Sequence, residues 1–204
     1  MARDVVGVIL AGGLARRMGG GDKCLKRVGG RSILDHVVER LTPQVGPIVL
    51  NANGDPARFA AQRLAVAADV VPGFAGPLAG VLTGMVWAAA HAPDMPWIVT
   101  VAGDAPFVPH DLVARLTAAV EAEHAEMACV ASRGRDNPVT GIWPVRLAAE
   151  LRRAIVDERI HKVDLWTARY SLARAEFPDA PFDPLFNVNT PDDLQMAEIL
   201  LAHR

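Results

Sequence analysis

The sequence of 204 residues has only two cysteines, Cys24 and Cys129, and they lie far apart. It contains no Cys-x-x-Cys pair, which argues against a disulfide framework and gives no indication of a zinc site. We interpret both cysteines as reduced thiols, as is typical of a protein in a reducing compartment. The apolar segment that follows Met1 is too short for a signal peptide, so the sequence predicts a cytoplasmic protein.

Neither sign of charge dominates, because 21 Lys and Arg residues stand against 23 Asp and Glu residues. This balance argues against a general binder of nucleic acid or of anionic membranes. Residues 73–92 carry no charged side chain apart from His91, but proline and glycine interrupt them. We interpret this stretch as a loop and a buried helix rather than a membrane span. The six histidines have neither an HExxH motif nor a paired ligand spacing, so the sequence assigns no metal to them.

Hydrophobic residues make up 51% of the chain, which is enough for one domain with a substantial core. Short apolar segments bounded by turn-forming residues alternate with segments that have helical spacing. The predicted strands are Val5–Leu10, Ile48–Leu50, Trp97–Val101 and Met127–Ala131, and the predicted helices are Ile33–Leu41, Asp55–Leu64, Leu78–His91 and Leu112–Glu123. This alternation predicts an α/β fold, a Rossmann-like three-layer sandwich with a mainly parallel sheet and helices on both faces.

The alternation breaks after residue 131. Residues 132–145 predict a polar excursion, and Arg146–Trp166 again has a helical pattern. Ser32 is a candidate cap for the first helix, and Thr190 is one for a last helix that begins with Pro191. We interpret residues 132–189 as an elaboration of the same domain.

The loop after the first predicted strand concentrates glycine and positive charge. Residues 10–31 hold seven glycines and one carboxylate, Asp22. The cations of this segment are Arg16, Arg17, Lys23, Lys26, Arg27 and Arg31. Glycine lets backbone N–H groups approach a ligand and cations neutralise phosphate charge, so the loop predicts a polyphosphate site. The alternative is a solvated glycine-rich loop. Neither a Walker A motif nor the spacing GxGxxG is present.

The loop also contains an ordered motif. Leu10-Ala11-Gly12-Gly13 is followed after three residues by Arg17-Met18-Gly19-Gly20 and after one more by Asp22-Lys23. The motif resembles the signature LAGGxxxRMGGxDK of the molybdenum cofactor guanylyltransferase family. Further matches are Asn51, Asp69, Gly76-Pro77-Leu78-Ala79-Gly80, Asp104-Ala105-Pro106 and Asn187-Val188-Asn189-Thr190-Pro191. The resemblance covers residues 5–110 and 185–200 and is thin over 130–180.

This resemblance implies a nucleotidyltransferase that moves GMP from GTP to molybdopterin-bound molybdenum cofactor and releases pyrophosphate. The implied GTP-binding residues are Leu10, Ala11, Gly12, Gly13, Lys23, Asn51, Asp69, Gly80 and Asp104. Arg17, Lys23 and Asp104 would be catalytic, with the cations on the triphosphate and Asp104 on Mg²⁺. Asn187 and Asn189 would line the acceptor site. Other cofactor-assembly proteins or molybdoenzymes are further expected partners.

The same resemblance divides a single domain, 1–204, into a nucleotide-binding half, 1–110, and an acceptor-side half, 111–204. Two other functions stay open at this point. One is a sister nucleotidyltransferase that uses a cytidylyl group or a sugar-phosphate acceptor, and the other is a non-catalytic GTP-binding partner in cofactor assembly.

Several of the implied site residues also have plainer roles. Asn51 and Asp69 could form turns, and the two asparagines at 187 and 189 could bond the turn before the last helix. Gly76, Gly80 and Gly84 recur at every fourth position, which removes three side chains from one helix face. Close packing or a ligand could explain them, and we expect packing at Gly84.

Overall fold

The computed structural model describes residues 4–12, 21–73, 76–179, 183 and 185–202. A central seven-stranded sheet has the strand order β5-β4-β1-β6-β8-β7-β9. The strands are β1 Val5–Leu10, β4 Ile48–Asn51, β5 Ala65–Ala67, β6 Trp97–Ala102, β7 Met127–Ser132, β8 Arg135–Pro144 and β9 Leu172–Glu176. Neighbouring strands are parallel except where β8 pairs with β6 and β7. The mainly parallel sheet of the predicted α/β fold is confirmed.

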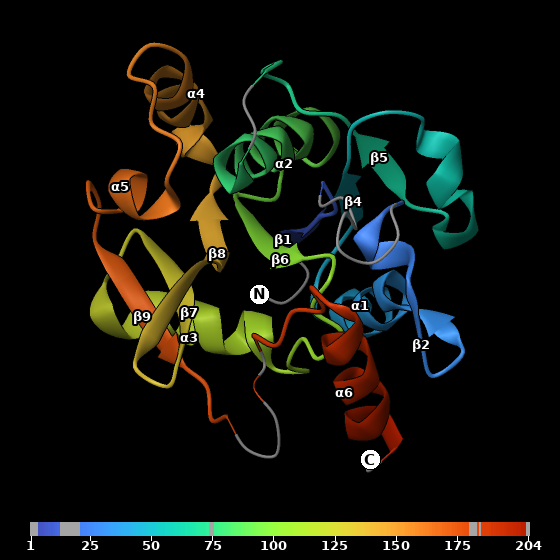
Figure 1. The fold of residues 1–204 in the computed structure, drawn as a ribbon. Helices are drawn as coiled ribbons and strands as arrows, with labels where there is room; N and C mark the ends of the chain where they lie inside the picture. The colour runs from blue at the N-terminus through green and yellow to red at the C-terminus, as the bar shows by residue number, and fades with distance from the viewer. Residues whose placement is uncertain (1–3, 13–20, 74–75, 180–182, 184, 203–204) are drawn as a thin grey trace.

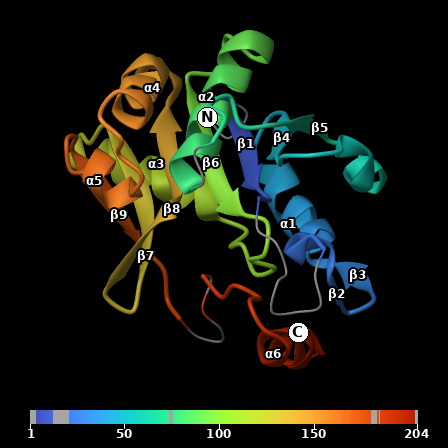
Figure 2. The same ribbon diagram turned by 45° about the horizontal axis from the view of Figure 1, so that its top comes forward.

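Helices cover both faces of this sheet (Figures 1 and 2). They are α1 Ile33–Leu41, α2 Pro77–His91, α3 Leu112–Glu123, α4 Ala148–Val156, α5 Val163–Thr167 and α6 Pro191–Ala202. Helices α1 and α3 contribute to one buried cluster, and α2, α4 and α5 contribute to the other. No helix in the part of the chain that the structure describes is long and apolar enough to cross a membrane.

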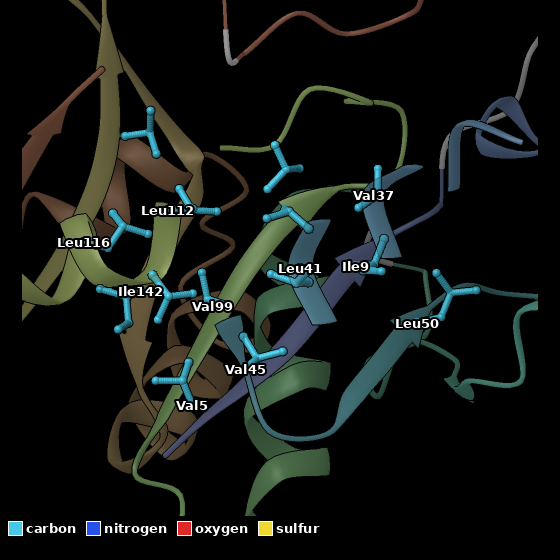
Figure 3. Packing of buried hydrophobic residues seen from close by; sticks show 14 of the residues in the cluster. Val5, Ile9, Val37, Leu41, Val45, Leu50, Val99, Leu112, Leu116 and Ile142 are labelled. Atoms are coloured by element: carbon cyan, nitrogen blue, oxygen red, sulfur yellow. The ribbon is translucent and has the colours of Figure 1, made fainter. Parts of the chain in front are cut away.

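Strand β1 contributes side chains to both clusters because alternate residues point to opposite faces. Val5 and Ile9 join the cluster of α1 and α3, which Figure 3 shows, whereas Val6 and Val8 pack against α2. An unbroken run of apolar residues is what a strand buried on both faces requires.

Capping boxes fix two helix starts that the sequence predicts. The Ser32 hydroxyl accepts from the Asp35 N–H at 3.1 Å, and the Asp35 carboxylate accepts from the Ser32 N–H at 3.0 Å. Thr190 and Asp193 make the same exchange at the start of α6, at 3.2 and 2.9 Å. Both predicted caps are confirmed.

Helix α6 lies beside strand β2 (Figure 1). β2 (Arg27–Val28) and β3 (Arg31–Ser32) form a small antiparallel hairpin that the sequence analysis missed. A separate apolar cluster joins the helix to this hairpin, and its buried members are Val28, Ile33, Phe107, Val188 and Ala197. This packing carries the segment before α6 across the carboxyl end of β6, where the Val188 N–H bonds the carbonyl of Asp104 at 2.9 Å.

Three predictions of secondary structure are wrong. Residues 132–145 form no excursion, because most of them belong to β8, whose polar start is exposed and whose apolar end, Thr140–Pro144, is buried. Asp55–Leu64 is a 3-10 helix over Pro56–Gln62 rather than an α-helix, and Asp55 caps it. The pattern over Arg146–Trp166 spans a short 3-10 turn, α4 and most of α5, with a break after Val156.

The order of the strands in the sheet predicts a crevice beside β1. After β1 the chain builds β4 and β5 on one side and then crosses to build β6 on the other. At such a switch point the loops that follow the parallel strands separate, and ligands of open α/β sheets bind there.

Candidate active site

A cavity of about 690 Å³ opens at the switch point, at the carboxyl ends of β1, β4, β5 and β6. Its lining residues are Leu10, Gly12, Asn51, Asn53, Asp69, Val71, Pro72, Gly73, Gly76, Pro77, Ala102, Asp104 and Val139. Five residues that the sequence analysis predicts for GTP are among them, and they come from the ends of β1 and β4 and from the loops after β1, β5 and β6. Gly13 and Arg17 lie outside the described residues.

One end of the cavity is a carboxylate held by two amides. The Asp69 oxygens accept from Asn51 Nδ2 at 2.9 Å and from Asn53 Nδ2 at 2.7 Å. The side-chain oxygen Oδ1 of Asn53 in turn accepts from the Asp69 backbone N–H at 2.9 Å. These bonds fix the plane of the carboxylate, and each oxygen keeps a further acceptor position toward the cavity.

Asn53 is a site residue that the sequence analysis missed. It lies two positions after Asn51, and extended backbone brings such residues to the same side of the chain. That spacing, directly after a predicted strand, was the signal available in the sequence.

A second polar group joins the glycine-rich loop to the end of β6. Lys23 Nζ donates to Asp104 Oδ2 at 2.8 Å and to Asn189 Oδ1 at 2.6 Å. The side chains of Lys23 and Asp104 are 17% and 19% exposed, so both charges are largely withdrawn from water. Among the described residues, Asp104 Oδ1 accepts no hydrogen bond. The two predicted catalytic residues that the structure describes are therefore in direct contact.

The two predicted acceptor residues do not face the same way. Asn189 contacts Lys23, whereas Asn187 lines a small neighbouring cavity together with Asn137 and Thr140. The buried Oδ1 of Asn187 has no hydrogen-bond partner within the described part of the chain. The Asn189 side-chain amide also donates to the backbone carbonyl of Asn187, at 3.3 Å.

The glycines of α2 serve close packing. A Cβ at Gly84 would lie 2.5 Å from Val8 Cγ2, as expected for packing against the sheet. A Cβ at Gly80 would lie 2.5 Å from both Asn51 Oδ1 and Leu10 Cδ2. Gly80 therefore makes room for the side chain that holds Asp69. Gly76 precedes α2 with φ of 152° and lines the cavity.

Ala11 reaches the site through its backbone. Its N–H donates to the Asn51 carbonyl at 2.9 Å, and the Gly103 N–H donates to the Leu10 carbonyl at 2.9 Å. These bonds extend the pairing of β1 with β4 and β6 to the rim of the cavity. They hold the starts of the three loops together.

Both cysteines are buried and form no disulfide. Burial raises the pKa of Cys24 to about 12 and the pKa of Cys129 to about 11. Both groups therefore stay protonated near neutral pH, and Cys24 acts as a small apolar residue of the core cluster of α1 and α3. The described residues contain no cluster of three or more His, Cys, Asp or Glu side chains that could hold a metal ion.

A family model and closely similar curated proteins point to the same family. Residues 7–170 match the family model described as "MobA-like NTP transferase domain". The chain is 58% identical over 198 residues to a molybdenum cofactor guanylyltransferase of Bradyrhizobium sp. (strain ORS 278), covering 97% of this chain and 93% of that protein. It is 56% identical over 191 residues to the enzyme of the same name from Rhodopseudomonas palustris (strain BisB5), covering 94% and 91%.

A solved structure shares the whole fold. The molybdopterin-guanine dinucleotide biosynthesis protein A of Archaeoglobus fulgidus superposes with a TM-score of 0.74 at 25% identity, covering 98% of this chain and all of that one. The sheet and its helices are thus arranged as in that protein.

Proposed function

The chain belongs to the MobA-like NTP transferase domain family, and we propose that it transfers GMP from GTP to molybdopterin-bound molybdenum cofactor. Relatives of that activity by name are similar to this chain over nearly its full length. The observation that carries the proposal is one cavity with a carboxylate at each end, Asp69 held by amides and Asp104 paired with a lysine.

The Asp69 end suits the guanine base. Guanine presents an N1–H and an exocyclic amine on one edge, and a carboxylate accepts from both. Asn51 and Asn53 hold Asp69 in one orientation, so the carboxylate is preorganised for such a pair of donors. Cytosine and adenine lack this pair of donors on one edge, which supports selection of GTP over CTP and ATP.

The Lys23 end suits the triphosphate. In the proposed reaction an oxygen of the acceptor's terminal phosphate attacks the α-phosphorus of GTP, and the bond from that phosphorus to the bridging oxygen of pyrophosphate breaks. Negative charge collects on the departing pyrophosphate, and Lys23 neutralises it. No general base is needed because the attacking oxygen is already an anion near neutral pH. Arg17 is proposed as a second cation of this loop.

The donor set fits a magnesium ion that arrives with the nucleotide. Asp104 lines the cavity with one carboxylate oxygen that no described residue occupies, and Mg²⁺ is commonly held by one or two carboxylates and the substrate phosphates. We propose that Asp104 holds Mg²⁺. When bound, the ion would offset phosphate charge and orient the α-phosphoryl group.

We assign residues 1–110 to the nucleotide and residues 111–204 to the acceptor. The contact of Asn189 with Lys23 supports a role at the acceptor phosphate. Asn187 supports the assignment through a buried Oδ1 that has no hydrogen-bond partner among the described residues. The two buried, unpaired thiols agree with a cytoplasmic enzyme.

Pyrophosphate release tests the proposed function. The protein is incubated with Mg²⁺, molybdopterin-bound molybdenum cofactor and GTP, CTP or ATP, and reactions without acceptor are the control. We expect pyrophosphate and the guanine dinucleotide cofactor with GTP alone. Equal turnover with CTP, or turnover with a sugar phosphate in place of the cofactor, would favour a sister nucleotidyltransferase. GTP binding without turnover on the authentic acceptor would favour a non-catalytic partner.

A further inference from the structure

Arg58 lies in the 3-10 helix Pro56–Gln62 and outside the cavity, yet it contacts segments at both ends of the site. Its two terminal nitrogens donate to the backbone carbonyls of Asn53 and Asp55. Its Nε lies 2.7 Å from Asp22 Oδ2. One guanidinium thus links the loop after β4 to the residue that precedes Lys23.

The first of these contacts acts on the base-binding end of the cavity. Asn53, whose carbonyl accepts from Arg58, exchanges two hydrogen bonds with Asp69. Movement of the Asn53 backbone would therefore move the amide that orients the Asp69 carboxylate.

The second contact acts on the phosphate end. Asp22 is only 12% exposed and is next in sequence to Lys23, whose ammonium contacts Asp104 and Asn189. Because Asp22 also precedes the short 3-10 turn Lys23–Leu25, its position fixes where the lysine leaves the backbone.

The surroundings hold the guanidinium in this place. Its central carbon lies 4.7 Å from the ring centroid of Phe59, which is buried. Gly54 has φ of 86°, and a Cβ there would lie 2.7 Å from Arg58 Nη1. The glycine therefore serves both the turn and the approach of the arginine.

We propose that Arg58 is a positioning residue that couples the base-binding end of the site to Lys23. The geometry explains why arginine stands here. The planar guanidinium can donate to two carbonyls and face a carboxylate at the same time, whereas the ammonium of lysine is a single compact charge that cannot reach all three groups in this way. This inference rests on the proposed function for the identity of the nucleotide. The contacts themselves do not depend on it.

An ordinary surface ion pair is the competing explanation. Arg169 and Glu158 form such a pair, with both side chains 40% exposed, and pairs of this kind contribute little. Arg169→Gln is therefore the matched control, since it removes an arginine–carboxylate pair that lies elsewhere in the chain.

The test is a mutant cycle on GTP affinity, measured by calorimetry without acceptor. Asp22→Asn weakens the contact of Arg58 at one end. Asn53→Ser keeps the backbone carbonyl that Arg58 contacts but removes the side-chain amide that bonds Asp69 at the other end. No hydrogen bond among the described residues joins the side chains of Asp22 and Asn53 directly. With Arg58 present we expect their combined effect on Kd to depart from the product of the single effects by about twofold or more. In an Arg58→Met background, or in Arg58→Lys if Arg58→Met does not fold, the combined effect of Asp22→Asn and Asn53→Ser on Kd should equal the product of their single effects.

Hydrogen exchange gives a readout that needs no nucleotide. The Asp69 amide, bonded to Asn53, should exchange about twofold faster or more in Asp22→Asn, and Arg58→Met should abolish this difference. Arg169→Gln should leave both readouts unchanged. The proposal would be overturned if the effects of Asp22→Asn and Asn53→Ser on Kd were independent while Arg58 is present. It would also be overturned if the coupling between them were unchanged after Arg58 is replaced. Coupling without transfer to the acceptor would contradict only the proposed function.

Discussion

Lys23 and Asp104 stand 81 positions apart in the sequence, and their side chains meet at 2.8 Å beside the cavity that Asp104 lines. Each is less than one fifth exposed, so the pair lies where water screens charge weakly. Removing one member of such a pair leaves the other charge without its partner in a poorly solvated place. The two residues should therefore be tested separately for activity and for stability.

Replacement of Lys23 by alanine should lower kcat/KM for GTP by about tenfold or more. The reason is the loss of a charged hydrogen bond to phosphate, worth roughly 1.5–3 kcal/mol. Pyrophosphate release at varied GTP concentration measures the effect. Lys26→Ala, three residues further on, is the control for loss of a cation from the same loop. Wild-type kinetics in Lys23→Ala would remove the lysine from the mechanism.

Asp104→Ala should abolish Mg²⁺-dependent turnover and leave the fold intact. The carboxylate is the proposed protein ligand of the ion, and the described residues offer no metal-binding cluster as a substitute. Activity is measured across a Mg²⁺ titration, with circular dichroism as the check on folding. Asp111→Ala is the control, because that carboxylate is 61% exposed and lies seven residues downstream. Normal activity of Asp104→Ala at low Mg²⁺ would show that the ion is held elsewhere.

Asp69→Asn should remove the preference for GTP over CTP and ATP. Asparagine would present an NH₂ group where the carboxylate now accepts from two amides, so one of the bonds from Asn51 and Asn53 must be lost. Thermal stabilisation by each nucleotide at equal concentration is the measurement. Asp55→Asn is the control, since that residue caps the neighbouring 3-10 helix. A GTP-specific shift that survives in Asp69→Asn would place base recognition on other atoms.

Local signals explain why much of the first half of the chain, though not the short strands β2, β3 and β5, is predictable from the sequence. Strand β1 and helix α1 have the predicted bounds, because apolar runs and helical spacing are read within each segment. The parallel order then brings the loop residues Asn51, Asp69 and Asp104 to one edge without further information.

The second half depends on contacts between distant segments. The polar start of β8 is a strand because it pairs with β7, where Arg135 and Asp136 lie opposite Ser132 and Ala131. Asp136 also forms an exposed ion pair with Arg174 of β9, on the far side of β7. Trp143 of the same strand is buried and donates to Thr100 of β6. Neither partner can be chosen from sequence spacing alone, so β8 and β9 were not predicted.

Asp35→Asn should destabilise the protein near neutral pH by about 1 kcal/mol, as for loss of a helix cap. Burial alone would raise the pKa of Asp35, but hydrogen bonds from Ser32 and Gln62 outweigh it and hold the pKa below its ordinary value of 3.8. A lowered pKa stabilises the folded state above pH 3.8, and this contribution is lost as the pH falls through the folded pKa. Urea unfolding of both proteins at pH 7 and near pH 3 measures it. A stability difference that stays constant over this range would contradict the assignment.

Gly80→Ala and Gly84→Ala form a matched pair on one face of α2. Each added methyl would lie 2.5 Å from a buried neighbour, so overpacking of about 1–3 kcal/mol opposes the roughly 0.8–1 kcal/mol that alanine gains in a helix. We expect a lower Tm in both variants, by about 2–4 °C for each kcal/mol of net loss. Only Gly80→Ala should also weaken GTP binding. Its methyl group would clash with Oδ1 of Asn51, which holds Asp69, whereas the methyl group of Gly84→Ala would clash with Val8 in the sheet. Calorimetric Kd values for GTP separate the two effects. Equal weakening in both variants would mean that the packing of α2 as a whole, rather than the position of Asn51, controls nucleotide affinity.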